Sequence, residues 1–353
     1  MRMLQILLLV FTAAAHGIAQ DLTARLDDAI KTVAANQTKF MGSVLVARDG
    51  KVILSKGYGF ANLEWDVPNS PSTKFRLGSI SKQFTAACIL LLEERGKLSV
   101  NDPVKKHLPD APAAWDQVTI HHVLSHTAGI PSFTSFPEYR TRKMHPATLE
   151  QSYLTYRDKP LEFAPGEKWS YSNSGYLLLS YLVEKISGSK YEEFLRENVL
   201  KPAGMNDSGY DLNALIIKHR AAGYTPFGTL IRNADYIDMT IPSGAGALYS
   251  TTEDLLRWEQ ALFGGRVISE ASLKKMTTPV RNDYAYGLIV KNLDGHRVIA
   301  HGGGIEGFNT SLSYFPDDRL VLVVLANVNG KAPEEIGSAV RKLALGVTAA
   351  PSK

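Results

Sequence analysis

Cysteine and clustered charge are both scarce in this sequence. Cys88 is the one cysteine among 353 residues, which excludes an intramolecular disulfide and a cysteine-based zinc site. The 39 basic and 35 acidic side chains are interspersed, without a block of five like charges, and give a formal net charge of +4. A nucleic-acid-binding surface needs a concentrated basic patch, so this charge pattern predicts no nucleic-acid partner.

The N-terminal apolar segment is too short to cross a membrane. Leu4–Phe11 is apolar apart from Gln5, whereas a transmembrane span needs roughly 20 apolar residues. Arg2 precedes this segment and small residues follow it as far as Ala19, a pattern typical of a secretory signal peptide. We expect cleavage after Ala19, which removes residues 1–19 and leaves a secreted or periplasmic protein. The alternative is a buried N-terminal helix.

Predicted strands lie near the two ends of the chain. Asp49-Gly50 separates two apolar runs, which is a strong signal for a β-hairpin over residues 43–54. Apolar and alternating segments near the C-terminus predict four more strands, at residues 285–291, 297–301, 308–315 and 320–326. Helices are expected outside these strands, from Leu22 to Val33 and from Pro333 onward.

The middle of the chain is predicted to be mainly helical. Residues 80–95 lack glycine and proline and stop at Gly96, so they form the longest predicted helix. Strand signals are scarce from there to about Pro242. The simplest fold that fits these signals is a single sheet built from strands at both ends of the chain. It divides the chain into an α/β sheet domain and a helical domain, at residues 20–78 with 245–353 and at residues 79–244.

Three familiar motifs are weak or absent. Gly302–Gly307 matches G-x-G-x-x-G, but a dinucleotide site needs this run to open a helix, and residues 308–314 alternate like a strand. His122 and His126 have the spacing of a zinc-binding helix, yet Val123 stands where the general-base glutamate belongs, so a structural role is favoured. G-x-S-x-G is absent, which excludes the nucleophile elbow of the α/β-hydrolases.

A serine–lysine pair is the strongest catalytic candidate. S-x-x-K occurs three times, at Ser79/Lys82, Ser187/Lys190 and Ser272/Lys275, and the last two pairs fall in polar segments typical of a surface. Ser79 begins the most apolar predicted helix, where a residue three positions on lies on the same face. Burial near the positive end of that helix would lower the pKa of Lys82, and a neutral lysine could accept the serine proton. The alternative is an N-cap serine with an exposed lysine.

Two further motifs each occur once. Tyr171-Ser172-Asn173 follows a loop signal, and in an extended segment residues two apart point the same way. Tyr171 and Asn173 are therefore expected to converge on one site. His301-Gly302-Gly303 ends a predicted strand, and the missing side chains at Gly302 and Gly303 would let a substrate backbone lie against it.

The three motifs together resemble those of the penicillin-recognising serine hydrolases, which carry S-x-x-K, Y-x-N and K-T-G or H-x-G in this order. The resemblance is to the branch with class C β-lactamases, D-Ala-D-Ala carboxypeptidases, D-aminopeptidases and esterases of the β-lactamase fold. It implies an α/β fold of the β-lactamase/transpeptidase type, in which helices flank an antiparallel sheet and an all-helical region is inserted. It also implies that no metal or cofactor is needed.

The resemblance further implies the catalytic roles. Ser79 would be the nucleophile that forms an acyl-enzyme, and Lys82 would share or take its proton. Tyr171, linked to Lys82, would protonate the leaving group and then activate the deacylating water. The backbone N–H groups of Ser79 and Gly304 would form the oxyanion hole.

The substrate-binding residues implied by the resemblance are Asn173, His301, Gly302 and Gly303. Asn173 would also hold Lys82. Many β-lactamases carry lysine where this chain has His301, and a hydroxyl residue where it has Gly302. A histidine is mostly neutral at pH 7, because its reference pKa is about 6.5. Both changes weaken the case for efficient β-lactamase activity.

The expected protein is therefore an exported serine hydrolase that acts through a Ser79 acyl-enzyme. Its substrates would be D-amino-acid peptides, in the manner of a D-Ala-D-Ala carboxypeptidase, or small acyl esters. The expected partners are such small molecules or peptides, including a β-lactam or a peptidoglycan stem peptide. A class C-type β-lactamase is one alternative, and a catalytically weak penicillin-binding or cell-wall regulatory protein is the other.

Overall fold

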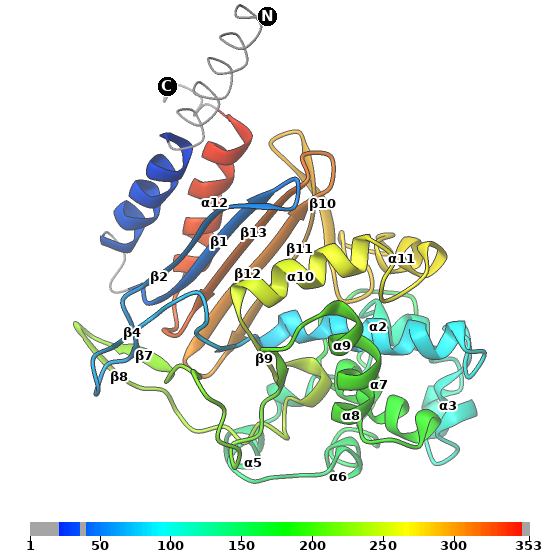
Figure 1. Cartoon of the computed structure of the whole chain (residues 1–353). Coiled ribbons are helices and arrows are strands. Elements are labelled where there is room, and N and C mark those ends of the chain that lie inside the picture. Colours follow the sequence, from blue (N-terminus) through cyan, green and yellow to red (C-terminus); the bar gives the residue numbers. More distant parts are fainter. Residues whose placement is uncertain (1–20, 36–39, 348–353) are drawn as a thin grey trace, which may run out of the picture.

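The computed structural model describes residues 21–35 and 40–347. The predicted signal peptide, residues 1–19, lies outside these ranges. Within them, no helix combines the length and the apolar character that crossing a bilayer requires. Strands from both ends of the described chain meet in one large sheet (Figure 1).

The large sheet has six antiparallel strands in the order β10-β11-β12-β13-β1-β2. Its strands are Gly42–Arg48 (β1), Lys51–Tyr58 (β2), Ile289–Leu293 (β10), His296–Ile305 (β11), Phe308–Phe315 (β12) and Leu320–Ala326 (β13). The first strand pairs with the last, so that Gly42 lies opposite Ala326. The expected antiparallel sheet from both ends of the chain is confirmed.

The β1–β2 turn forms where Asp49-Gly50 predicts it. Asp49 and Gly50 have φ values of 54° and 74°, the positive values that a two-residue turn of type I′ needs. The bounds of β12 and β13 also match the prediction. β10 begins at Ile289 rather than at Ala285, because the Ala285 N–H is hydrogen-bonded to the Leu288 carbonyl in a turn (2.8 Å).

Helices cover both faces of the large sheet. The helix at residues 21–35 and α12 (Ala332–Leu345) lie side by side on one face (Figure 1). α10 (Thr252–Phe263) packs on the other face, against β1 and β13. Successive side chains of β1 are buried on opposite faces of the sheet. Val44 packs on the face covered by α12, and Leu45 packs on the face covered by α10.

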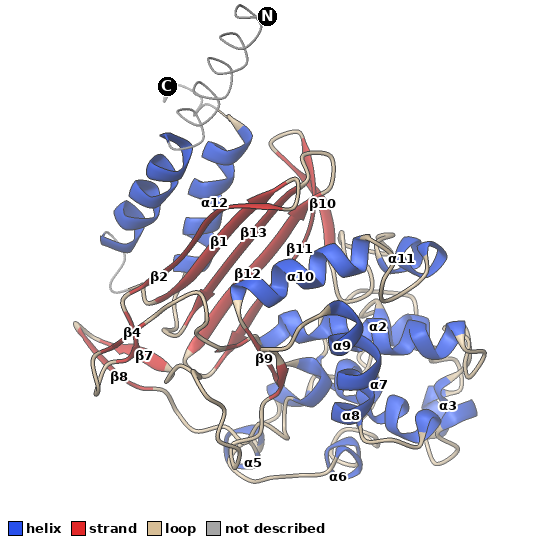
Figure 2. Ribbon diagram, in the orientation of Figure 1, coloured by secondary structure: helices blue, strands red, loops and turns tan. Residues whose placement is uncertain are grey.

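The part of the sequence between β2 and β10 is mainly helical (Figure 2). Its longest helices, α2 (Ser81–Glu94) and α7 (Asn173–Ser187), pack against each other. The shorter helices of the described chain are Val104–His107 (α3), Ile120–Leu124 (α4), Tyr139–Arg142 (α5), Leu149–Tyr153 (α6), Tyr191–Leu195 (α8), Lys201–Ala203 (α9) and Glu270–Met276 (α11). Every residue of α2 from Ser81 to Leu92 is buried, as its apolar sequence predicts.

Several short strands lie outside the large sheet, and the sequence did not predict them. They are Phe60–Asn62 (β3), Val67–Pro68 (β4), Phe75–Arg76 (β5), Gly209–Tyr210 (β6), Tyr224–Phe227 (β7), Leu230–Asn233 (β8) and Leu248–Ser250 (β9). Strands of two to four residues are too short to show a hydrophobic period. The domain boundaries given above stay a prediction.

Candidate active site

Ser79 lies in a single 3-10 turn, Gly78–Ile80, directly before α2. Gly78 has a φ of +56°, and a Cβ at this position would come within 2.8 Å of the Gly304 backbone nitrogen. Glycine is therefore required for the turn that carries Ser79 to approach β11 this closely. Ser79 itself is partly exposed and lines a pocket between the sheet and the helical region.

Lys82 is fully buried in the first turn of α2, and its amine has three polar neighbours. The Nζ atom lies 2.9 Å from Asn173 Oδ1, 2.8 Å from the Ala245 carbonyl oxygen and 3.0 Å from Ser79 Oγ. Burial holds the pKa of Lys82 well below its usual range. A neutral amine has two N–H groups, which the amide and carbonyl oxygens accept. The remaining lone pair then faces Ser79 Oγ and can take its proton.

The Ser79 side chain acts on the Tyr171 hydroxyl, whose pKa it lowers against the larger effect of burial. Burial raises the pKa of Tyr171, so the phenol keeps its proton at neutral pH. Lys82 Nζ lies 4.8 Å from the centre of the Tyr171 ring. The resemblance implied a link between Tyr171 and Lys82, and in the structure the Lys82 amine faces the Tyr171 ring.

Asn173 is the first residue of α7, and it lines the same pocket as Ser79. Ser172 caps this helix, because its side chain accepts the N–H of Gly175 at 3.3 Å. Asn173 Nδ2 donates to Thr134 Oγ1 at 3.3 Å, which leaves Oδ1 directed at Lys82. The Y-x-N segment is thus extended only as far as Ser172, and the helix start brings Asn173 to the lysine.

The glycines of β11 let this strand pack against the segment before Ser79. A Cβ on Gly303 would lie 1.9 Å from the Leu77 carbonyl oxygen, so no other residue fits there without moving the backbone. Thr310 Oγ1 donates to the same carbonyl oxygen at 2.7 Å. As a result, Gly304 and Ser79 line the same pocket, the arrangement that an oxyanion hole of two backbone N–H groups requires.

His301 is buried on β11, 6.3 Å from Tyr171 between ring centres. Its Nδ1 lies 2.6 Å from the Gly302 carbonyl oxygen, which only accepts, so Nδ1 carries the proton. Nε2 then accepts the hydroxyl of Tyr284 at 3.1 Å. Burial lowers the pKa of His301 to about 4, and the nearby Lys82 adds to this shift. The imidazole is therefore neutral at pH 7, as the sequence predicted.

The structure adds His126, to which the sequence assigned a purely structural role. Its ring centre lies 4.4 Å from that of Tyr171 and 4.6 Å from that of Tyr284. Its Nδ1 accepts the Ser172 N–H at 3.2 Å, and Nε2 is buried without a partner among the described residues. Burial, with a smaller contribution from Lys82, holds the pKa of His126 well below its usual range.

The zinc interpretation of His122 and His126 finds no support in the structure. His122 Nδ1 accepts the Thr119 N–H in the capping box of α4, and His126 follows after that helix has ended. No group of three potential metal ligands occurs within residues 21–35 and 40–347. The turn sequence 127–129 was the signal that the chain leaves the helix at His126.

The remaining motifs lie outside the site or form other structures. Gly302–Ile305 pairs with β12 in a hairpin, so the G-x-G-x-x-G run does not open a helix. Lys190 is exposed, and Lys275 forms an ion pair with Glu93 at 2.9 Å. Of the three S-x-x-K pairs, only the one at Ser79 has a buried lysine facing the serine.

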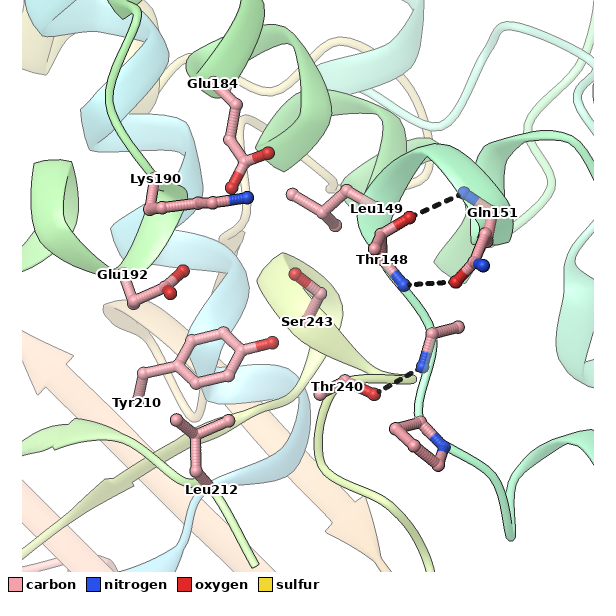
Figure 3. Close-up of a pocket in the computed structure, with 12 residues that line it drawn as sticks. Thr148, Leu149, Gln151, Glu184, Lys190, Glu192, Tyr210, Leu212, Thr240 and Ser243 are labelled. Atoms are coloured by element: carbon pink, nitrogen blue, oxygen red, sulfur yellow. Dashed lines mark hydrogen bonds between the residues drawn. The ribbon is translucent and has the colours of Figure 1, made fainter. Parts of the chain in front are cut away.

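Several cavities lie in this part of the molecule. The one beside Ser79 has a volume of about 90 Å³, and its walls include Asn173, Gly304 and Glu306. A larger cavity of about 360 Å³ lies between α6, α7 and the loop before η5 (Ser243–Ala245), and Figure 3 shows the side chains around it. None of the predicted site residues lines this second cavity.

Comparison with known proteins matches this architecture to one family. The model of the Beta-lactamase family matches residues 26–346. The chain is 33% identical to penicillin-binding protein 4* of Bacillus subtilis, over 82% of this chain and 68% of that protein. Among solved structures, the octameric penicillin-binding protein homologue from Pyrococcus abyssi has a TM-score of 0.82 at 30% identity, and the match covers 92% of this chain and 77% of that one.

A further structural neighbour has a different activity. The D-amino acid amidase from Ochrobactrum anthropi SV3 has a TM-score of 0.79 at 21% identity, over 92% of this chain and 98% of that one. This likeness shows the fold alone, and it confirms the expected β-lactamase/transpeptidase-like class together with the two matches above. The resemblance inferred from three short motifs thus extends along nearly the whole described chain, which belongs to the Beta-lactamase family and is a β-lactamase-fold serine hydrolase.

Proposed function

We propose that this hydrolase forms an acyl-enzyme on Ser79 and acts on D-amino-acid peptides or small acyl esters. The observation that carries the proposal is the 3.0 Å contact between Ser79 Oγ and the buried amine of Lys82. The amine has no carboxylate within ion-pairing distance among the described residues, so burial acts on it without compensation. A neutral lysine in contact with a serine hydroxyl is a general base for nucleophilic attack.

In the acylation step, Ser79 Oγ attacks the substrate carbonyl and its proton passes to Lys82. The carbonyl oxygen becomes an oxyanion held by the Ser79 and Gly304 N–H groups. Tyr171 gives its proton to the leaving group and receives one from Lys82, for which the phenol must turn from its position in the free enzyme, where the amine faces the ring. Because burial raises the pKa of Tyr171, a free phenolate is costly, and both transfers occur together.

Deacylation uses the same groups in reverse order. A water molecule attacks the acyl carbonyl and gives its proton through Tyr171 to Lys82. Lys82 then returns a proton to Ser79 Oγ as the acyl bond breaks. Asn173 holds the lysine throughout, and His301 with Gly302 and Gly303 provides the edge along which the substrate lies.

The neutral His301 favours peptidase or esterase activity over β-lactamase activity. A lysine at this position is a permanent cation that can anchor a substrate carboxylate, and a neutral imidazole is not. The structural neighbours include a D-amino acid amidase and a hydrolase with promiscuous acyltransferase activity, EstCE1. We also propose that residues 1–19 are removed on export, and N-terminal sequencing of the exported protein would then begin at Gln20.

The deciding experiment is the intact mass of the protein after mixing with benzylpenicillin, while the antibiotic itself is followed. Wild type and Ser187→Ala, a matched control at another S-x-x-K serine, should both gain the mass of one penicilloyl group, and Ser79→Ala should not. A lasting adduct supports slow deacylation, as in a D-Ala-D-Ala peptidase. Loss of antibiotic without a lasting adduct would identify a β-lactamase instead.

If penicillin neither reacts nor disappears, a p-nitrophenyl ester and a serine-reactive phosphonate decide the outcome. Labelling of wild type and not of Ser79→Ala supports the esterase or D-peptidase function. Failure of both reagents to label Ser79 would overturn the proposal and favour the catalytically weak binding protein.

A further inference from the structure

Among the described residues, Glu306 is the one charged side chain on the wall of the cavity beside Ser79, and it also lines an adjoining cavity together with Arg76 and Arg220. It lies in the turn between β11 and β12, two residues beyond Gly304. The other walls of the cavity beside Ser79 are polar but uncharged or apolar, with Phe133, Tyr139 and Ile305 among them. Any charged group of a substrate that enters this cavity therefore meets a carboxylate first.

Only one oxygen of the Glu306 carboxylate is occupied. Lys143 Nζ donates to Oε1 at 2.7 Å, and the two side chains are 16% and 18% exposed. The other oxygen, Oε2, has no hydrogen-bond partner within the described part of the chain. A carboxylate can accept several hydrogen bonds, so Lys143 fixes the orientation of Glu306 and leaves Oε2 for a second donor.

Lys143 is itself held in place by the helical region. Its carbonyl oxygen accepts the Asp238 N–H at 2.7 Å. Four residues later, the Ala147 N–H donates to Thr240 Oγ1 at 3.0 Å, a bond drawn at Thr240 in Figure 3. Because the ion pair joins this anchored segment to the β11–β12 turn, the position of the carboxylate is fixed from both sides of the cavity.

The order of residues along β11 places Glu306 on the acyl side of the site. His301 lies next to Tyr171, the proton donor to the leaving group in the proposed reaction. Gly304 lies three residues along at the oxyanion, and Glu306 lies beyond it. Since an extended strand advances about 3.3 Å per residue, the leaving group and Glu306 are at opposite ends of the substrate.

The geometry points to an acyl-side ammonium as the substrate feature that Glu306 recognises: given the proposed function, the enzyme prefers esters and amides of free amino acids over N-acylated ones. The ammonium donates to Oε2 while Lys143 occupies Oε1. Burial keeps Lys82 and His301 neutral. The arginines of the adjoining cavity, Arg76 and Arg220, are paired with Asp211. Lys143 is therefore the cation that shares Glu306 with this ammonium. A substrate carboxylate at the same place would lie against the carboxylate of Glu306 and be repelled by it.

The test compares D-alanine methyl ester with methyl propanoate, which differ by the ammonium group, and measures kcat/KM by proton release. An α-ammonium group makes an ester more reactive even without the enzyme. The readout is therefore the ratio of kcat/KM for D-alanine methyl ester to kcat/KM for methyl propanoate, compared between wild type and variants. We expect Glu306→Gln to lower the ratio about ten-fold or more, the effect of losing one charge-assisted hydrogen bond. Glu193→Gln, at an exposed site on α8, should keep the wild-type ratio.

Lys143→Met distinguishes recognition from a structural role. It frees Oε1 while retaining the carboxylate, so the ratio should stay at or above the wild-type value, whereas a structural role predicts the same change in both variants. An unchanged ratio in Glu306→Gln with active enzyme would overturn the inference and leave the proposed function intact. A ratio that falls equally in Lys143→Met and in Glu306→Gln would also overturn it, because the ion pair would then act only as a structural link between the helical region and the β11–β12 turn. If Ser79 proves unreactive toward every ester, both proposals fail together.

Discussion

The imidazole of His126 lies against the phenol of Tyr171, with the two ring centres 4.4 Å apart. The same histidine accepts the backbone N–H of Ser172, the next residue along. One buried side chain therefore positions both the ring and the main chain of the Y-x-N segment. No hydrogen bond joins His126 to Ser79 in the described structure, so we expect it to act through Tyr171 as a positioning residue.

We expect His126→Asn to lower kcat about ten-fold or more, with a smaller effect on KM. Asparagine tolerates the left-handed φ of +58° at this position, but it removes the ring that packs on Tyr171. The free energy of unfolding should fall by about 1–3 kcal/mol. Urea unfolding and steady-state kinetics measure the two effects, with His122→Asn as the control. A normal kcat in a destabilised His126→Asn variant would show that the contact is only structural.

Replacement of Lys82 by methionine should slow acylation by about 10²–10⁴-fold, since the general base is lost. The active form of Lys82 is neutral, and burial places its pKa well below 10.5. In the wild type, kcat/KM should therefore be full above this lowered pKa and fall as the pH decreases through it. The burst of p-nitrophenol from a p-nitrophenyl ester, followed across pH, checks both points. Near-normal acylation by Lys82→Met would exclude this lysine as the base.

Gly303→Ala should abolish the close contact between β11 and the segment before Ser79. Its Cβ would lie 1.9 Å from the Leu77 carbonyl oxygen and 2.4 Å from Thr310 Oγ1. We expect kcat to fall about 10²–10³-fold, as when one oxyanion-hole donor is lost, together with a lower thermal midpoint. Gly302→Ala is the stability control, because its Cβ would meet only the Thr310 carbonyl oxygen at 3.5 Å. Equal thermal midpoints for the two variants would contradict the prediction.

The buried carboxyl of Glu259 lies outside the active site. It should make the folded protein less stable as the pH rises. This carboxyl is 4% exposed on α10, and its Oε2 atom is buried without a partner among the described residues. Burial raises its pKa from 4.5 to about 8, so the folded protein retains a proton that the unfolded chain releases. Its contribution to stability is complete below about pH 4.5 and is lost as the pH rises through about 8.

Glu259→Gln should therefore be more stable than wild type at pH 9, by about 2–4 kcal/mol, and nearly equal to it at pH 4.5. Urea unfolding at the two pH values measures the difference. Glu193→Gln, which changes an exposed carboxyl, should show no such pH-dependent gain. A constant difference between Glu259→Gln and wild type at both pH values would mean that the carboxyl titrates normally.

Long and strongly patterned elements could be predicted from the sequence. The β1–β2 hairpin followed from Asp49-Gly50, and β12 and β13 followed from alternation and from an apolar run. The burial of α2 followed from a composition apolar on all sides. Ser79, Lys82, Tyr171 and Asn173 could be grouped because three ordered motifs resemble one family, and the structure brings these side chains together.

The rest depends on tertiary packing that no local pattern encodes. His126 reaches Tyr171 only because the chain leaves α4 in a left-handed turn. Lys143 and Glu306 are 163 residues apart, and they meet because the helical region folds over the end of β11. The short strands β5, β6 and β9 hold two or three residues each, and pairing partners distant in sequence determine them.

The pairing of β1 with β13 makes folding depend on a segment that is synthesised after the whole helical region. Until Leu320–Ala326 has been made, β1 lacks its partner β13, and the β1–β2 hairpin exposes a second edge of unpaired backbone groups in addition to the β2 edge. A ribosome that stops early would release a chain with its helical region formed around an incomplete sheet. Nonsense mutations between α10 and β13 should therefore yield aggregated protein rather than a shorter working enzyme.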